Sequence, residues 1–256
     1  MIHPTAIIDP SCELANDVSI GAYAIIGSDV RIDSGTEIGP HTVIKGPSRI
    51  GKHNRIFQFA SVGEDPQDKK YHGEVTYLEI GDRNVIREYV TIHRGTVQDQ
   101  GITRIGNDNL LMAYTHVAHD CVLGDHVIMA NAASLAGHVR VDDYAILGGF
   151  SLVHQFCKIG QHSFSAMGSV ITRDILPYVM VGGCPTKPHG INTVGLERQG
   201  FSADSIRQIR KAYKTVYKSR LKLEEAIQQL EEMISETPEI QKMVDFLKQT
   251  GRSIIR

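Results

Sequence analysis

A hydrophobic residue returns at every sixth position along most of this chain, and this period constrains the fold more than any other feature. The period runs from Ile2 to Val62 and from Ile80 to Ile92. It then continues, shifted by one residue, from Ile105 to Ile171, and Ser165 is the one position along these stretches that is not aliphatic. An α-helix repeats about every 3.6 residues and a strand every two, so neither explains this spacing.

The period of six fits a parallel β-helix, with one short strand and one corner in each hexad and three hexads in each coil. Glycine often follows the aliphatic residue, as at Gly21, Gly81 and Gly124. Adjacent coils should lie ~4.8 Å apart, the ordinary spacing of paired strands. Residues three hexads apart therefore stack in columns, and the aliphatic side chains fill the interior.

The repeat is interrupted and then replaced along the chain. Two insertions, 64–79 and 94–104, break the period, and insertions in a solenoid project as loops that often build a binding face. Further on, the segments "FSADSIRQIRKAYKTVYKS", "LKLEEAIQQLEEMISE" and "PEIQKMVDFLKQ" have helical periodicity. We therefore expect an all-β parallel β-helix domain at 1–190 and a C-terminal α-helical domain at 191–256.

Bulk composition excludes several classes of protein. A net charge of −2 argues against a nucleic-acid partner, which would require a basic excess. The N-terminus "MIHPTAIIDP" lacks the features of a signal peptide, and no apolar run approaches the roughly 18 residues of a membrane span. The four cysteines form no CxxC pair that would indicate a zinc ribbon. We expect a soluble, cytoplasmic protein.

The stretch "MAYTHVAHDCVLG" places His119 at an outward corner of its hexad. Gly137 and then Gln155 follow it in the same column, and Asp120 stacks on His138 in the next column. A neutral histidine can accept a proton near pH 7, and a glycine N–H can face a developing oxyanion. The column therefore predicts acid–base chemistry. Other histidines gather around it: His116, His138 and His154.

These histidines have two other interpretations, a metal site and ordinary solvated corner residues. His116 and His119 are three residues apart, which on an extended strand places them on opposite sides, so we predict no metal site. Solvated corner residues would explain one histidine but not several on consecutive coils.

Specific motifs then carry a family resemblance over essentially the whole chain. They are "QDKKY" (67–71), "IREYVTIHRGT" (86–96), "HVAHDC" (116–121), "SLAGHV" (134–139), "VHQFC" (153–157) and "GLERQGFS" (195–202). Together they resemble the UDP-N-acetylglucosamine O-acyltransferase family, the first enzymes of lipid A biosynthesis. The resemblance implies a left-handed β-helix, whereas general crossover rules would favour the right hand.

The resemblance also implies a homotrimer with active sites between subunits. There an (R)-3-hydroxyacyl group, delivered on the phosphopantetheine of acyl carrier protein without a further cofactor, moves to the glucosamine 3-hydroxyl of UDP-N-acetylglucosamine. It makes His119 the general base and the Gly137 N–H the oxyanion donor, and Asp120 could orient His119. Matching substrate-binding residues are Gln67, Asp68, Lys70, His116, His138, His154, Gln155, Asn192 and Arg198. The chain departs from the family's nucleotide-end pattern at Val194 and Gln199.

Two further sites follow from position and charge. Met167 is a large apolar residue at an outward corner, where the resemblance places the far end of an acyl groove. The size of its side chain predicts a preference for acyl chains of medium length, about ten carbons. A basic stripe at helical spacing predicts a docking surface for acidic acyl carrier protein. The stripe consists of Arg207, Arg210, Lys211, Lys214 and Lys218.

Other functional classes remain open at this point. Zinc-dependent hydrases of the γ-class carbonic anhydrase type have a similar fold and bind zinc with histidines that lie between subunits. A non-catalytic scaffold, with the β-helix as a rigid spacer, would bind no nucleotide sugar.

Overall fold

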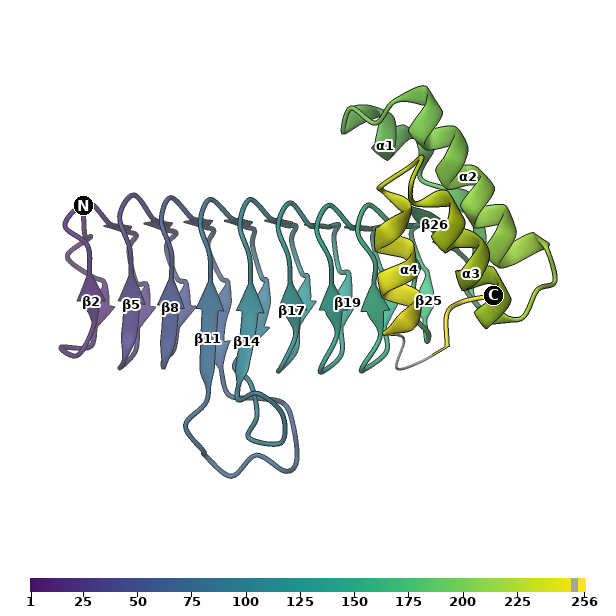
Figure 1. The fold of residues 1–256 in the computed structure, drawn as a ribbon. Coiled ribbons are helices and arrows are strands. Elements are labelled where there is room, and N and C mark those ends of the chain that lie inside the picture. Colours follow the sequence, from purple (N-terminus) through teal and green to yellow (C-terminus); the bar gives the residue numbers. More distant parts are fainter. Residues whose placement is uncertain (250–252) are drawn as a thin grey trace.

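The structure, a computed structural model, describes residues 1–249 and 253–256. Figure 1 shows an elongated β-helix whose coils stack from the N-terminal end toward a group of helices at the other end. Strands three positions apart in the order pair in parallel, with Ile7 opposite Ile25 and Ile8 opposite Ile26. The structure therefore confirms the prediction that residues one coil apart stack on each other.

The strands form three sheets, one along each side of the β-helix. Sheet 1 contains β1 (Ile7–Ile8), β4 (Ile25–Ile26), β7 (Val43–Ile44), β10 (Ser61–Glu64), β13 (Thr91–His93), β16 (His116–Val117), β19 (Ser134–Leu135), β22 (Leu152–Val153) and β25 (Val170–Ile171). Sheet 2 contains β2 (Glu13–Leu14), β5 (Val30–Ile32), β8 (Ser48–Ile50), β11 (Tyr77–Ile80), β14 (Ile102–Ile105), β17 (Val122–Leu123), β20 (Arg140–Val141) and β23 (Lys158–Ile159). Sheet 3 contains β3 (Ser19–Ile20), β6 (Glu37–Ile38), β9 (Arg55–Ile56), β12 (Val85–Ile86), β15 (Leu110–Leu111), β18 (Ile128–Met129), β21 (Ile146–Leu147), β24 (Phe164–Ser165), β26 (Val179–Gly182) and β27 (Lys187–Ile191).

The interior is filled by the residues of the six-residue period. From Ile20 onward each of these side chains is buried, whereas Ile2 at the open N-terminal end is 48% exposed. Ser165, the exception to the aliphatic pattern, is buried and its hydroxyl lies 2.8 Å from the hydroxyl of Ser151 in the preceding coil. The two serines satisfy each other, so this polar pair costs the core little.

Both insertions leave the β-helix at the corner between sheet 1 and sheet 2, and they form the loops that project beside β11 and β14 in Figure 1. Their irregular parts are shorter than the sequence suggested, covering 65–76 and 94–101. β11 and β14 pair over four residues, from Tyr77 opposite Ile102 to Ile80 opposite Ile105. These ladder hydrogen bonds draw the ends of both insertions into sheet 2.

The C-terminal region contains α1 (Thr193–Arg198), α2 (Ala203–Lys218), α3 (Leu223–Met233) and α4 (Ile240–Lys248). Ser202 caps α2 by accepting a hydrogen bond from the Ser205 N–H, as its helix-start signal predicts. The sequence pattern does not predict α1 or the antiparallel pairing of β26 with β27, which precede the first long amphipathic segment. None of the described helices combines the length and apolar character needed to cross a membrane.

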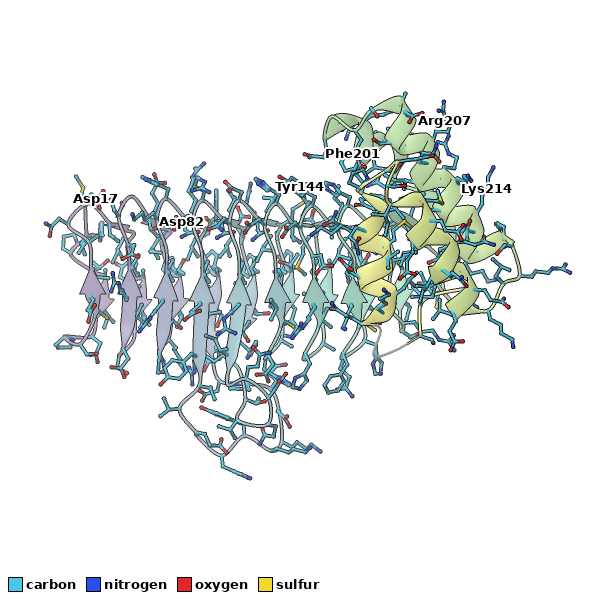
Figure 2. The ribbon with its side chains drawn as sticks, viewed as in Figure 1. Asp17, Asp82, Tyr144, Phe201, Arg207 and Lys214 are labelled. Carbon is cyan, nitrogen blue, oxygen red and sulfur yellow. The ribbon has the colours of Figure 1, made fainter. Side chains whose placement is uncertain are left out.

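An aromatic column connects the β-helix to the helices. The rings of His126, Tyr144 and His162 stack at successive corners with centroids 4.6 and 4.7 Å apart. Phe201, from the segment that enters α2, packs edge-on against His162 at 5.1 Å. Figure 2 shows Tyr144 on this edge and Phe201 where the helices begin. These contacts fix the helical region on the last coils.

Candidate active site

The predicted histidine column lies at the corner from which the insertions leave the β-helix. His119 and Asp120 connect β16 to β17, and Gly137 and His138 connect β19 to β20 one coil further on. The His138 N–H donates to the His119 carbonyl at 3.0 Å, which fixes the register between the two corners. The column inferred from the period is therefore present.

His119 and Asp120 form a buried acid–base pair. The Nδ1 atom of His119 lies 2.9 Å from Oδ2 of Asp120, whose side chain is 1% exposed. Asp120 also accepts hydrogen bonds from Thr96, 2.9 Å from its N–H and 2.6 Å from its hydroxyl. Burial acts to raise the pKa of Asp120, but the hydrogen bonds from His119 and Thr96 outweigh it and hold the pKa below its usual range. The carboxylate is thus charged near neutral pH.

The charge on Asp120 determines the tautomer of His119. A carboxylate only accepts hydrogen bonds, so Nδ1 of His119 must carry the proton that lies between them. The Nε2 atom of a neutral His119 then has a free lone pair. The pair therefore has the arrangement of a general base with an orienting carboxylate.

Gly137 is buried directly against the ring of His119. A Cβ atom at this position would lie 2.5 Å from Cε1 and 2.7 Å from Nε2 of His119. Its N–H has no hydrogen-bond partner among residues 1–249 and 253–256. A free N–H beside an unprotonated Nε2 can bind a negatively charged oxygen.

His138 lies beside the acid–base pair in a nearly closed environment. Its Nδ1 atom is 2.8 Å from Oδ2 of Asp99 and 3.8 Å from Oδ2 of Asp120. Its ring stacks on Phe156 at 4.5 Å and meets the His119 ring edge-on at 5.0 Å. Its side chain is 13% exposed, so the ring has one defined orientation.

His116 belongs to the same cluster but has a different electrostatic setting. Its Nδ1 atom lies 2.7 Å from the hydroxyl of Thr91, and its ring meets that of the buried His93 at 5.3 Å. Burial lowers the pKa of His116 to about 4, and His93 and His119 add to the effect. His116 is therefore neutral near pH 7 and can offer a hydrogen bond but no charge.

The root of the first insertion is fastened by Arg94. This buried guanidinium donates to the Gly63 carbonyl at 2.5 Å, to the Asp65 carboxylate, and to the Tyr71 hydroxyl at 3.2 Å. His93 adds a bond between its Nδ1 atom and the Asp65 carbonyl at 2.5 Å. The loop that carries the "QDKKY" motif is therefore held to the strand that leads into the histidine cluster.

The remaining predicted substrate residues lie around this cluster without bonding to its histidines. Asp68 accepts a hydrogen bond from the Lys70 N–H at 3.0 Å, while the side chains of Gln67 and Lys70 are exposed. His154 and Gln155 lie exposed one coil beyond His138. Within the part of the chain that the structure describes, none of these side chains bonds to the His119 group.

Asn192 and Arg198 are on α1 and its cap, outside the histidine cluster. Asn192 accepts from the Gly195 N–H and donates to the His162 carbonyl, so its amide has a structural role in capping α1. Arg198 is exposed in the last turn of that helix. The structure does not bring either residue to His119 within one chain.

A metal interpretation can be examined on the geometry of the donors. The structure brings together one ligand atom each from His119, Asp120 and His138 within 4.8 Å, a metal set that the sequence does not predict. The carboxylate of Asp120 and the Nδ1 atoms of His119 and His138 already make hydrogen bonds with one another, with Thr96 and with Asp99. A cation would have to displace these hydrogen bonds, so the donor set fits proton chemistry better than metal binding.

The two predicted sites that lie away from the histidine cluster, Met167 and the basic stripe on α2, are both exposed. Met167 is 74% exposed at its corner. In the basic stripe, Arg207 pairs with Asp204 and Arg210 donates to the Thr193 hydroxyl at 3.1 Å. Lys211, Lys214 and Lys218 have no ion-pair partner in the described residues, and Figure 2 shows Arg207 and Lys214 on the outer side of α2.

Sequence reasoning missed the contribution of segment 94–101, above all Thr96 and Asp99. These residues do not belong to the six-residue period, so no spacing rule relates them to the corner histidines. The one available signal is that an insertion in a solenoid lies beside a corner that carries unusual polar residues.

Known proteins resemble this chain over its full length. Residues 174–255 match the family described as UDP-N-acetylglucosamine O-acyltransferase, domain 2, and residues 102–137 match bacterial transferase hexapeptide repeats. Two relatives bear the name acyl-[acyl-carrier-protein]–UDP-N-acetylglucosamine O-acyltransferase. The one from Halorhodospira halophila is 55% identical and that from Stutzerimonas stutzeri 53%, each match covering 100% of this chain and 99% of the relative.

Solved structures give the same picture. The UDP-N-acetylglucosamine O-acyltransferase of Moraxella catarrhalis is 48% identical with a TM-score of 0.98, and the match covers 100% of this chain and 99% of that one. The Francisella novicida UDP-N-acetylglucosamine acyltransferase is 41% identical with the same TM-score, covering 100% and 94%. The predicted fold class, a left-handed parallel β-helix with a C-terminal α-helical domain, is confirmed.

Proposed function

The chain belongs to the UDP-N-acetylglucosamine O-acyltransferase family, and from this membership we propose that it carries out the first step of lipid A biosynthesis. The reaction transfers an (R)-3-hydroxyacyl group from acyl carrier protein to the glucosamine 3-hydroxyl of UDP-N-acetylglucosamine. The observation that carries the proposal is the Nε2 atom of His119, oriented by Asp120, beside the N–H of Gly137, which has no partner among the residues that the structure describes.

The chemistry follows from these groups. His119 Nε2 takes the proton of the sugar 3-hydroxyl while that oxygen attacks the thioester carbonyl. The Gly137 N–H donates to the oxyanion of the tetrahedral intermediate. Collapse of the intermediate breaks the carbon–sulfur bond, and the departing phosphopantetheine sulfur takes the proton back from His119. Asp120 stabilises the positive charge that His119 carries between these steps. The chain needs no cofactor for these reaction steps.

The other predicted residues are assigned to binding. Together they would hold the sugar, the diphosphate and the acyl hydroxyl. They are Gln67, Asp68 and Lys70 on the first insertion, His116 and His138 on the corner, and His154 and Gln155 one coil beyond. A neutral His116 suits hydrogen bonding to a hydroxyl rather than ion pairing with phosphate, because its pKa is about 4.

Assembly completes the site in this proposal. Asn192 and Arg198 would contact the nucleotide bound at a neighbouring subunit of a homotrimer, which accounts for their distance from His119 in one chain. The basic stripe on α2 would dock acidic acyl carrier protein, mainly by accelerating association. The reaction would take place in the cytoplasm.

Met167 would limit the acyl chain. Its side chain would occupy the space of the last methylenes of a long acyl group at the end of a groove between subunits. Each methylene denied burial loses roughly 0.8 kcal/mol, so excluding three lowers affinity by about two orders of magnitude. The expected donors therefore carry medium chains of about ten carbons.

One experiment separates this proposal from the other classes. Purified protein is incubated with UDP-N-acetylglucosamine and 3-hydroxyacyl carrier proteins, with and without a strong chelator. We expect full transfer in chelator. Loss of activity there, restored by zinc, would indicate a hydrase-type metal centre, and failure to bind the nucleotide sugar in calorimetry would indicate a scaffold.

A further inference from the structure

Segment 94–101, which we call the strap, folds over the corner that carries both His119 and His138. It leaves β13 after His93 and returns to β14 at Ile102. A Cβ at Gly95 would lie 2.0 Å from the Ile102 nitrogen, so the two ends of the strap are pressed together. The strap is therefore a closed turn with a defined shape.

Thr96 makes hydrogen bonds both within this turn and to Asp120. Its carbonyl accepts hydrogen bonds from the Gly101 N–H at 3.0 Å and the Asp99 N–H at 3.2 Å, and its own N–H and hydroxyl both point at Asp120. Thr96 is fully buried, while Asp99 at the tip is exposed. One residue thus connects the fold of the strap to the carboxylate that orients His119.

The strap contacts both imidazoles through carboxylates. On one side Thr96 donates to Asp120, which accepts a hydrogen bond from Nδ1 of His119. On the other side Asp99 itself lies 2.8 Å from Nδ1 of His138. The two histidines lie on successive coils, and each has its Nδ1 atom directed at a carboxylate.

We propose that the strap positions two separate His–Asp pairs, with Thr96 acting through Asp120 on the base His119 and Asp99 acting on the substrate-binding ring of His138. Both imidazoles are then held with the proton on Nδ1 and the lone pair on Nε2. The kinetic part of this inference rests on the proposed acyl transfer. The tautomers themselves are a property of the protein alone.

The two halves of the strap should have different kinetic signatures. Thr96→Val removes the hydroxyl and keeps the side-chain volume and the N–H, so kcat should fall roughly 10-fold with little change in KM for UDP-N-acetylglucosamine. Thr96→Ser keeps the hydroxyl and should restore kcat to within about 2-fold. Asp99→Ala should instead raise that KM roughly 5-fold with little change in kcat.

Matched controls exclude a general loss of stability. Thr36 is another fully buried threonine, whose hydroxyl donates to the Gly51 carbonyl at 2.8 Å on distant coils. Gln98 is exposed on the strap beside Asp99. Thr36→Val and Gln98→Ala should leave both kinetic constants near those of the unaltered enzyme. Equal effects in each variant and its control, or the same mixed effect in both strap variants, would overturn the proposal.

Nitrogen-15 labelling of histidine provides a readout that requires no activity. In the unaltered protein the signals of His119 and His138, assigned by His119→Asn and His138→Asn, should show protonated Nδ1, and Asp99→Ala should change the His138 signal alone. Protonated Nε2 on either ring of the unaltered protein would overturn the proposal. The expected tautomers in a protein that makes no acylated sugar would support the strap and refute the acyl transfer.

Discussion

The α-carbon of Gly137 lies against the imidazole of His119, so closely that a Cβ there would be 2.5 Å from Cε1. The two residues are on successive coils of the β-helix, and their contact follows from the stacking of corners. This stacking places the backbone N–H of Gly137 beside the imidazole ring of His119.

Gly137→Ala should therefore damage the chemistry more than the fold. The added methyl group must push the His119 ring aside, and we predict a fall in kcat of about 100-fold, since misplacing a catalytic group by about 1 Å costs that much. Gly149→Ala is the control, because it occupies the same hexad position and its Cβ would meet only the Asn131 carbonyl, at 3.3 Å. Comparable kcat in the two variants would show that the contact is irrelevant.

Met167→Gly should lengthen the preferred acyl chain. Removing the side chain opens space for additional methylenes, so kcat/KM for a donor of about fourteen carbons should rise roughly 10- to 100-fold relative to one of about ten. Met167→Leu keeps most of the volume and should keep the original profile. Competition assays with mixed acyl carrier proteins measure the ratio, and an unchanged profile in Met167→Gly would remove Met167 from this role.

Charge reversal on α2 tests the docking stripe. Lys211 and Lys214 are exposed and lack ion-pair partners within residues 1–249 and 253–256, so reversing them to Glu breaks no intramolecular ion pair. We predict roughly a 10-fold higher KM for the acyl carrier protein, with a weaker dependence on salt. Lys52→Glu on the β-helix is the control, and equal KM values in the variant and the control would reject the stripe.

His116 should make the protein sensitive to acid. The unfolded chain takes up a proton at this residue near its ordinary pKa of 6.5, whereas burial lowers the pKa in the folded protein to about 4. Between these values the unfolded state binds more protons, so stability falls as the pH falls. We predict that His116→Asn loses less thermal stability than the unaltered protein between pH 7 and pH 5. An equal loss in both proteins would contradict the shift.

Much of the β-helix could be predicted because the same burial pattern repeats every six residues. One aliphatic side chain in each hexad must face the narrow interior. The six-residue period alone therefore predicts that residues such as Ile44, Leu111 and Ile171 are buried, and no knowledge of long-range contacts is needed. The same period predicts His119, Gly137 and His138 at neighbouring corners. The helix-start signal at Ser202 likewise depends on local geometry alone.

The insertions and the transition to the helices could not be predicted in this way. The bonds from Thr96 to Asp120 and from Asp99 to His138 depend on how an irregular segment folds back on the corner. The pairing of β26 with β27 and the short α1 arise where the repeat ends, and their sequences carry weak periodic signals. Such features are set by tertiary contacts rather than by local pattern.

The most direct test of the central claim compares the unaltered protein with His119→Ala in single-turnover acyl transfer, with products identified by mass spectrometry. The unaltered protein should convert UDP-N-acetylglucosamine to its 3-O-(3-hydroxyacyl) derivative. His119→Ala should bind the sugar nucleotide with similar affinity and react about 10²- to 10⁴-fold more slowly. No acylated product from any donor, or an unchanged rate in His119→Ala, would contradict the assignment of His119 as the base of an acyltransferase.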